Sequence, residues 1–316
     1  MKKRYLVLVL IILSFISLFI GVYDISFNDI TSGNIDKIEV MLISRLPRLA
    51  SIIFAGVGLS IGGVIMQQIS NNKFVSPTTA ATIDSAKLGI LFASLLFGSV
   101  TLMQKMIWAF IFAMIGTFIF MRILKKIKYK NAVFIPLLGI MLGNVIGAIT
   151  DFIAYRYDMV QNMNSFLQGS FSGILRGNYE LMYLTIPLII LALLYANKFT
   201  IIGMGEDISR NLGLDFNKIA NIGISIVAMI SAVVVITVGN IPFVGLIVPN
   251  IVSLKMGDNL NKSIWHTALF GAIFVLICDI VGRLIIFPYE IPISVTVGTI
   301  GSIVFLYLIF RRNSND

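Results

Sequence analysis

The sequence has too little charge for a soluble protein. Only 12% of its 316 residues are charged, whereas 58% are hydrophobic and the mean hydropathy is +0.95. Ordinary soluble domains carry about 25% charged residues, because a surface that faces water needs polar cover. Lipid must be the solvent for much of this chain, which predicts an all-α polytopic membrane protein. The net charge of +9 then fits basic residues that flank membrane spans, and no nucleic-acid partner is expected.

The chain also has a single cysteine, Cys278, and a single histidine, His266. One cysteine cannot form an internal disulfide, and this pair cannot make a conventional zinc site. His266 follows Trp265 near a loop that contains lysine, so we interpret it as an interfacial side chain. With so few candidate groups, the sequence predicts neither an enzyme nor a metal site.

A nucleotide-binding P-loop is missing, because a Gly-Lys dipeptide occurs nowhere in the chain. We therefore expect no cofactor on this subunit. If transport is driven by ATP, then ATP and magnesium must bind to a separate ATPase subunit. No polar stretch is long enough for a soluble domain, so residues 1–316 are expected to form a single transmembrane domain.

Apolar runs bounded by polar clusters predict about ten transmembrane helices of roughly 20 residues each. The N-terminal run lacks a small-x-small cleavage site, so it is interpreted as the first span rather than a signal peptide. The expected spans are 4–22, 45–68, 77–98, 103–124, 131–154, 180–197, 217–238, 241–257, 263–286 and 294–311.

The distribution of basic residues predicts that both termini lie in the cytoplasm. With that orientation, 16 of the 24 Lys and Arg residues are on the inner side and Lys87 lies within a span. Cytoplasmic loops carry an excess of Lys and Arg, so this split favours the assignment. The seven outer residues are Lys37, Arg45, Arg48, Lys105, Arg156, Arg176 and Arg283.

Three segments between the spans are longer than simple turns. Residues 23–44 suit a short helix lying on the outer surface, and residues 155–179 are polar. Residues 198–216 form the only sizeable cytoplasmic loop, in which Glu206 and Asp207 precede Arg210 at a spacing that suits a short charged helix. This loop is either a solvated connector or the surface on which a cytoplasmic partner pushes.

The segment from Gly239 to Asn250 places Pro242, Gly245 and Pro249 among apolar residues. A broken helix at membrane depth is tolerated only where it packs against protein or lines a cavity. Such breaks are typical of transport pathways. The sequence therefore predicts a translocation path beside this segment.

Several charged residues lie within or at the ends of the expected spans. Arg45 and Arg48 are three residues apart and share one helix face, where they would anchor the helix at the interface or pair with carboxylates of a docked protein. Asp84 and Lys87, at i and i+3, would either pair with each other or contribute to conduction. Asp279 and Arg283, at i and i+4, pose the same question.

The second span has two further features. Gly56, Ser60 and Gly63 have the spacing of small residues that permits close helix packing. Gln67 and Gln68, followed by Asn71, Asn72, Lys73 and Pro77, form a polar hinge before the third span.

Taken together, these residues resemble the permease subunits of ABC importers for iron–siderophores, haem and vitamin B12. Arg45-Leu46-Pro47-Arg48 resembles the RLPR motif of that family, and Gly56 through Met66-Gln67 resembles its glycine-rich second span. Gly239 to Pro249 is similar to its G-x-I-x-FVGLIVP element. Asp279, Arg283 and Glu290-Ile291-Pro292 are similar to its D-x-x-x-R…E-x-P ending.

The resemblance implies a vitamin B12 importer-type permease fold in the cytoplasmic membrane of a bacterium. It implies a dimer of permeases, two cytoplasmic ATPase subunits and an extracytoplasmic siderophore-binding protein. By the same resemblance, Arg45, Arg48 and Arg283 are docking residues for the binding protein. Coupling to the ATPase falls to Gly205, Glu206, Asp207, Arg210, Leu212 and Gly213. The translocation path or gate falls to Gln67, Asn72, Pro77, Asp84, Asn144, Pro242, Pro249 and Asn250.

Two departures from the family pattern bear on the substrate. The usual Asn-Pro-Leu-Ala-x-Pro hinge is here Asn72-Lys73-Phe74-Val75-Ser76-Pro77, and Asn250 and Ser253 replace a histidine and an arginine. The hinge resembles the branch for catecholate and petrobactin-like siderophores, in which two different permeases often pair. We therefore expect a ferric siderophore as cargo and a heterodimer. Vitamin B12 and haem are the alternative cargoes, and an ion-coupled secondary transporter is the alternative class.

Overall fold

The computed structural model describes residues 3–23, 25–26, 29, 33–97, 101–127 and 134–313, with the side chains of 125, 165–167, 308–309 and 311–313 excepted. Within these residues the chain is helical, apart from turns and one isolated bridge between Gln168 and Asn240. Of the basic residues used for the orientation, Lys2, Lys128 and Lys130 and the side chains of Lys125, Arg311 and Arg312 lie outside the described part.

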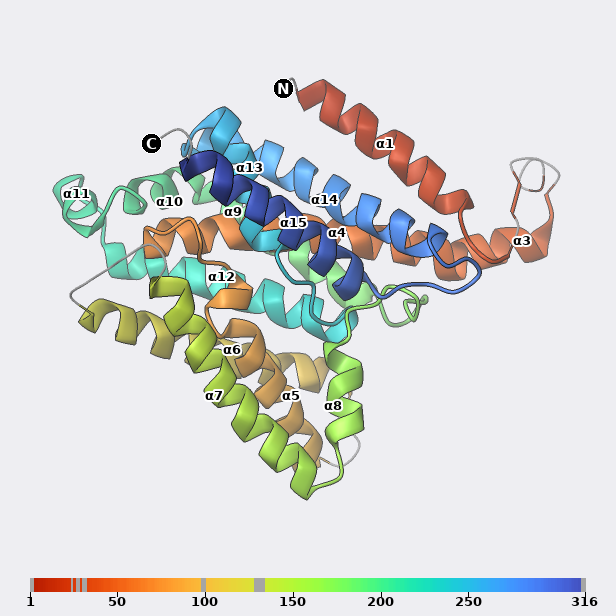
Figure 1. The fold of residues 1–316 in the computed structure, drawn as a ribbon, viewed down its shortest axis with the longest axis horizontal. Helices are drawn as coiled ribbons and strands as arrows, with labels where there is room; N and C mark the ends of the chain where they lie inside the picture. The colour runs from red at the N-terminus through yellow and green to blue at the C-terminus, as the bar shows by residue number, and fades with distance from the viewer. Residues whose placement is uncertain are drawn as a thin grey trace.

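Most of the long helices run side by side along one axis of the molecule (Figure 1). The α-helices are α1 (Lys3–Phe19), α3 (Ile35–Val40), α4 (Leu46–Ser70), α5 (Thr82–Phe97), α6 (Leu102–Lys126), α7 (Phe134–Arg156), α8 (Val160–Leu167), α9 (Thr185–Leu194), α10 (Ala196–Ile202), α11 (Glu206–Asn211), α12 (Phe216–Thr237), α13 (Val244–Met256), α14 (Leu260–Leu284) and α15 (Ile293–Asn313). A π-helical turn covers Met41–Arg45, and 3₁₀ turns cover Pro77–Thr79 and Glu180–Leu184.

Each of the ten expected spans contains a helix in the described structure. By length and hydropathy, five uninterrupted helices in this part of the chain are able to cross a membrane, and a bent pair makes a sixth. The shorter apolar helices include α13 and the described part of α15. The prediction of an all-α polytopic membrane protein is confirmed.

The sixth span differs from its prediction in both shape and extent. The sixth span is not one straight helix, because α9 and α10 meet at Tyr195 with a bend of 60°. Since α10 continues to Ile202, the connector predicted to start at 198 begins after that residue. An apolar run cannot reveal such a bend, because hydropathy carries no information on the direction of a helix.

The outer segment before the second span also differs from its prediction. Instead of a separate helix on the surface, α3 continues through the π-helical turn directly into α4, giving one helical rod over Ile35–Ser70. The free end of this rod projects beyond the other helices (Figure 1). Asn34 begins the rod, and its side chain accepts a hydrogen bond from the Lys37 backbone N–H.

The core forms around α4, α12 and α14, whose facing residues are almost fully buried. Glycine lets the backbones approach closely, as predicted. A Cβ built on Gly56 would lie 2.6 Å from the Gly271 carbonyl oxygen of α14, and one built on Gly63 would lie 2.5 Å from the Gly245 Cα of α13. The small residues of α4 are therefore packing residues.

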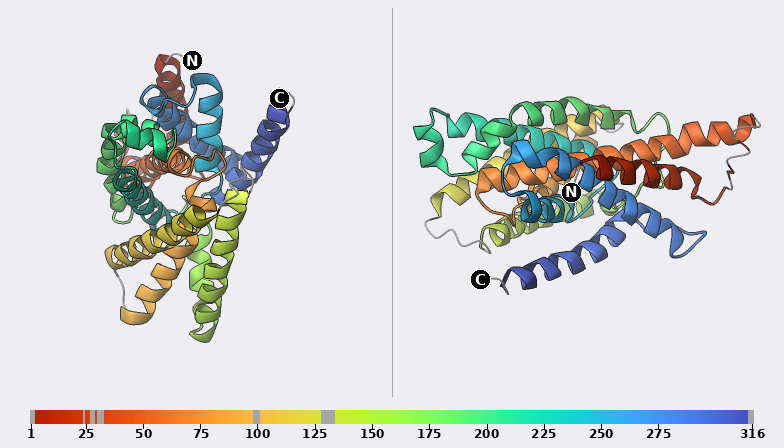
Figure 2. Two further views of the ribbon diagram at one scale, coloured as in Figure 1. Left: turned by 90° about the vertical axis from the view of Figure 1, so that its left-hand side faces the viewer. Right: turned by 90° about the horizontal axis from the view of Figure 1, so that it is seen from above.

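Helices α5, α6 and α7 form a second layer on one side of this core (Figure 1). Among the five span-length helices, α7 is the least covered, with only 22% of its apolar window buried. Helix α15 stands on one flank of the bundle in both views of Figure 2. Both helices leave uncovered faces for lipid or for another subunit.

The predicted break after the seventh span is present. Helix α12 ends at Thr237, and α13 starts at Val244 after Phe243, whose φ of 63° lies in the left-handed region. The backbone N–H of Ser170 donates to the Val238 carbonyl at 2.8 Å, so the chain after α8 satisfies part of the exposed backbone. Pro249 lies inside α13 without ending it.

Candidate functional site

A cluster of charged side chains joins the start of α4 to the end of α14. Arg48 donates to both carboxylate oxygens of Glu290, at 2.8 and 2.9 Å, and to Asp279 Oδ1 at 2.7 Å. The second oxygen of Asp279 lies 2.7 Å from Arg283 Nη2 as an ion pair, although no described donor is aligned with it as a hydrogen bond. The predicted pairing of Asp279 with Arg283 is confirmed.

The other two outer arginines hold the end of α1. Arg283 Nη1 donates to the carbonyl oxygens of Ser17 and Ile20, at 3.0 and 2.8 Å. Arg45 donates to the carbonyls of Leu18 and Tyr23. The last carbonyls of a helix have no intrahelical partner and carry partial negative charge, so guanidinium groups stabilise them. Arg45 and Arg283 therefore fix where α1 ends.

This arrangement bears on the docking role predicted for Arg45, Arg48 and Arg283, which stays a prediction. Arg45 and Arg283 are 9% and 5% exposed, and both are engaged within the chain. Arg48 is the most accessible of the three, with 14% of its side chain exposed next to Glu290. A docked carboxylate would therefore meet Arg48 first.

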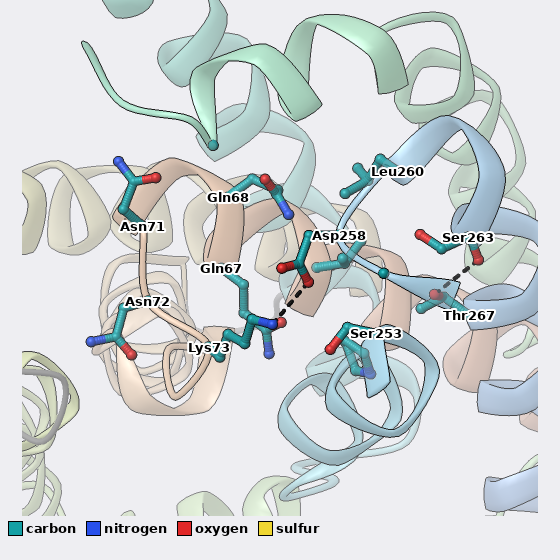
Figure 3. Close-up of a pocket in the computed structure, with 14 residues that line it drawn as sticks. Gln67, Gln68, Asn71, Asn72, Lys73, Ser253, Asp258, Leu260, Ser263 and Thr267 are labelled. Carbon is teal, nitrogen blue, oxygen red and sulfur yellow. Dashed lines mark hydrogen bonds and ion pairs between the residues drawn. The ribbon is translucent and has the colours of Figure 1, made fainter. Parts of the chain in front are cut away.

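At the opposite end of α4, a cavity of about 140 Å³ opens between α4, α13 and α14 (Figure 3). Its lining includes the polar side chains of Gln67, Asn72, Ser253 and Thr267. Lys73 and Asp258 form an ion pair of 2.9 Å at its rim.

The hinge between α4 and α5 is tied to α13 at this cavity. The side-chain amide of Asn250 donates to the carbonyls of Lys73 and Leu246, at 2.8 and 2.7 Å. Asn72 caps the turn by accepting from the Phe74 backbone N–H at 2.8 Å. Asn250 stands where the family pattern has a histidine. Its side chain holds the backbone of the altered hinge against α13.

The predicted path residues fall into separate groups. Around the cavity and hinge the structure brings together Gln67, Asn72, Pro77, Pro249 and Asn250. Pro242 lies apart in the break before α13, while Asp84 and Asn144 lie on α5 and α7. Their common role in a path stays a prediction.

The suggested pairing of Asp84 with Lys87 was wrong. Lys87 Nζ instead contacts Asp151 Oδ1 of α7 at 2.8 Å. Asp84 rests against α7 at Gly143, where an added Cβ would overlap its carboxylate. We did not single out Asp151 from the sequence, although a carboxylate inside the predicted fifth span was an available signal.

The segment predicted to couple to a cytoplasmic partner forms a short helix, α11, between α10 and α12. Glu206 and Arg210 pair at 2.7 Å, as the spacing indicated, and Leu212 is 59% exposed. Asp215 caps α12, and the hydrogen bond from the Lys218 backbone N–H lowers the pKa of its carboxyl. The segment is thus an ordered surface rather than a loose connector.

One pattern in α4 matches a nucleophile motif, Gly58-Leu59-Ser60-Ile61-Gly62. Ser60 is fully buried in the helix and donates to the Gly56 carbonyl at 2.7 Å. A nucleophile of this type needs an exposed strand-to-helix turn, which is not present at these residues. Ser60 is a packing residue.

Comparison with known proteins identifies the family of this chain. The model of the FecCD transport family matches residues 9–311. The petrobactin import system permease YclN of Bacillus subtilis is 55% identical over 314 residues, covering 99% of both chains. The petrobactin import system permease FatD of Bacillus anthracis is 39% identical over 306 residues, covering 97% of this chain and 90% of that protein.

Among solved structures, a metal-chelate type ABC transporter in an inward-facing conformation aligns with a TM-score of 0.83 at 24% identity. The alignment covers 98% of each chain, so the whole fold is shared. The chain belongs to the FecCD transport family, and it is a multi-pass membrane permease rather than an enzyme.

Proposed function

We propose that this chain is the permease subunit of an ATP-driven importer that carries a ferric siderophore of the petrobactin type across the cytoplasmic membrane. The observation that carries the proposal is 55% identity, along the full length, to a petrobactin permease. The altered hinge from Asn72 to Pro77, held by Asn250, supports the same branch.

The iron is cargo and stays inside its chelator, so this subunit needs no metal site of its own. Among the described residues, no group of three or more His, Cys, Asp or Glu side chains is placed to hold an ion. ATP and magnesium would bind to the ATPase partners.

The proposed assembly contains a second permease, two cytoplasmic ATPases and an extracytoplasmic binding protein. The uncovered face of α7 supports a second permease, because polar side chains at bilayer depth avoid lipid and this face carries exposed Asn144 and Asp151. We favour a different chain as that partner. Both termini would lie in the cytoplasm, with α11 facing the ATPase and the charged cluster at Arg48 facing outward.

The test is uptake of ⁵⁵Fe-labelled siderophores by iron-limited cells with and without this chain, with redundant importers deleted. The panel contains ferric petrobactin and other ferric catecholates, with haem and vitamin B12 as comparators. We expect loss of ferric petrobactin uptake and its restoration by the wild-type chain. Loss of only haem or B12 uptake would refute the substrate, and no loss of any would refute the importer.

Docking through Arg48 is a testable part of this proposal. Replacing Arg48 by glutamine removes the accessible guanidinium, so the binding protein should bind about tenfold more weakly, as expected for losing a charge-assisted hydrogen bond. The measurement is the Kd of the binding protein for the permease–ATPase complex in nanodiscs. Arg176→Gln, an exposed arginine after α8, is the control. Equal affinity of the two variants would exclude Arg48 from docking.

Coupling through the α11 segment gives a second prediction. Leu212→Asp places a charge on an exposed apolar contact, so transport should fall about tenfold, the loss expected for a residue central to an interface. ATP hydrolysis should no longer respond to the loaded binding protein. Leu175→Asp, at a leucine that is 44% exposed on the other end of the molecule, should leave both unchanged. A Leu212 variant with normal stimulation would place coupling elsewhere.

A further inference from the structure

An ion pair between α5 and α7 has no role in the site described so far. Lys87 Nζ lies 2.8 Å from Asp151 Oδ1, and the two side chains differ sharply in accessibility, at 9% and 64% exposed. Lys87 thus extends from within the layer toward an acceptor on the open face of α7. The pair lies at the rim of that face rather than inside the core.

This rim lies within α7, a helix long and apolar enough to cross a membrane. Asp151 lies five residues before the end of α7 at Arg156, which corresponds to roughly 7 Å along a helix. Asn144, about two helical turns earlier and therefore on the same side of the helix, is also exposed on α7. Charged and amide side chains at such a depth face a protein interior or an aqueous path, not lipid. In the proposed assembly, the polar stripe on α7 therefore faces the second permease and the path between the two chains.

Asp84 completes the cluster from the side of α5. Its carboxylate rests where Gly143 has no side chain, since an added Cβ would lie 3.2 Å from its Cγ and closer still to one oxygen. Lys87 is the only cation of this cluster and faces two carboxylates. Its attraction to Asp151 is accordingly shared, and Asp151 is much the less enclosed of the two partners.

A passing ligand with anionic oxygens matches Lys87. A ferric chelate built from catecholate or carboxylate groups presents such oxygens, so it competes with Asp151 for the ammonium group. A conduction site must bind strongly enough to admit its cargo and weakly enough to release it. Asp151 satisfies both requirements, because its carboxylate gives way when the cargo binds Lys87 and returns to Lys87 as the cargo leaves.

We propose that Lys87 is a transit site for the anionic ferric chelate, with Asp151 as the exchangeable internal partner that occupies Lys87 between transport events. The inference rests on the proposed function. It assigns Lys87 to the cargo and Asp151 to release, whereas a purely structural pair would need both equally.

The experiment uses the complete importer in proteoliposomes, with ⁵⁵Fe-labelled ferric petrobactin delivered by the binding protein. Initial uptake and the melting temperature are measured for Lys87→Met, Asp151→Asn and the double variant. We expect Lys87→Met to lower the uptake rate about tenfold, the effect of one lost charge-assisted bond. Asp151→Asn should keep at least half of the rate, and the double variant should be as slow as Lys87→Met. Lys87→Arg should recover transport.

A structural pair predicts a different pattern. Removing either partner would then leave an uncompensated charge, so both single variants would lose melting temperature and uptake, and the double variant would recover. That pattern, or normal uptake by Lys87→Met, would overturn the proposal. Lys37→Met breaks an outer ion pair of the same 2.8 Å length and is the matched control. Failure of the wild-type importer to carry ferric petrobactin would refute the proposed function instead, because every variant is compared with that rate.

Discussion

Replacing Gly63 by alanine is expected to leave little folded permease. A Cβ at this position would lie 2.5 Å from both the Cα and the carbonyl carbon of Gly245, and closer still to the carbonyl oxygen. These are backbone atoms, so no change of rotamer relieves the overlap and α13 must move away from α4. Overpacking of this kind costs about 3 kcal/mol at the upper end of its usual range.

The measurement is the fraction of monodisperse protein after solubilisation, together with its melting temperature. Gly147→Ala is the matched control, because a Cβ built there has no neighbour within 4 Å and α7 is less crowded. It should behave as wild type or gain slightly from better helix propensity. If Gly63→Ala and Gly147→Ala have the same melting temperature, the close approach of α4 and α13 is not a feature of the folded protein.

Asp279→Ala is expected to be the most damaging change among the charged residues. Asp279 is 4% exposed and is the shared partner of Arg48 and Arg283. Its removal leaves Arg283 without its carboxylate beside the end of α1. Breaking a buried ion pair by removing one partner costs about 3–5 kcal/mol, because the remaining charge stays buried without compensation.

A control with the same chemistry is available at the other end of the molecule. Asp258→Ala breaks the ion pair with Lys73, but the two side chains are 58% and 40% exposed, so the expected cost is about 0–1 kcal/mol. The two variants are compared by melting temperature in the same detergent. The double variant Asp279→Ala, Arg283→Met should melt above Asp279→Ala. Equal melting of the two single variants would show that the outer cluster is not a buried network.

Loss of anchoring should also appear locally in the Asp279 variant. Arg283 would then be free to leave the carbonyls of Ser17 and Ile20, which it reaches at 3.0 and 2.8 Å. Relative to the wild type, hydrogen exchange in this variant should become faster at the end of α1 and change less in α12.

Much of the fold was predictable because the bilayer imposes a single length scale. Runs such as 103–124 and 217–238 became α6 and α12, since an apolar segment in lipid must satisfy its backbone within its own helix. The break near Gly239 was predictable for a different reason, because glycine and proline act locally on the backbone.

The sites were predictable only in part. The pairing of Asp279 with Arg283 is a property of one helix, and its i to i+4 spacing revealed it. The pairing of Lys87 with Asp151 joins residues that are 64 positions apart, so the local spacing from Asp84 suggested the wrong partner. The bend at Tyr195 and the fusion of α3 with α4 were missed because hydropathy carries no information on helix direction.

By itself, the sequence determined the solvent of this protein, the existence of its main helices, the break near Gly239 and the motifs of its family. Each of these depends on the composition of one segment or on residues within a helical turn of each other. Only the tertiary structure decided which partners the polar side chains meet: Arg45 and Arg283 at the end of α1, Asn250 at the hinge, and Lys87 at Asp151. A long side chain chooses its partner by which helices pack together, and packing is a property of the whole chain.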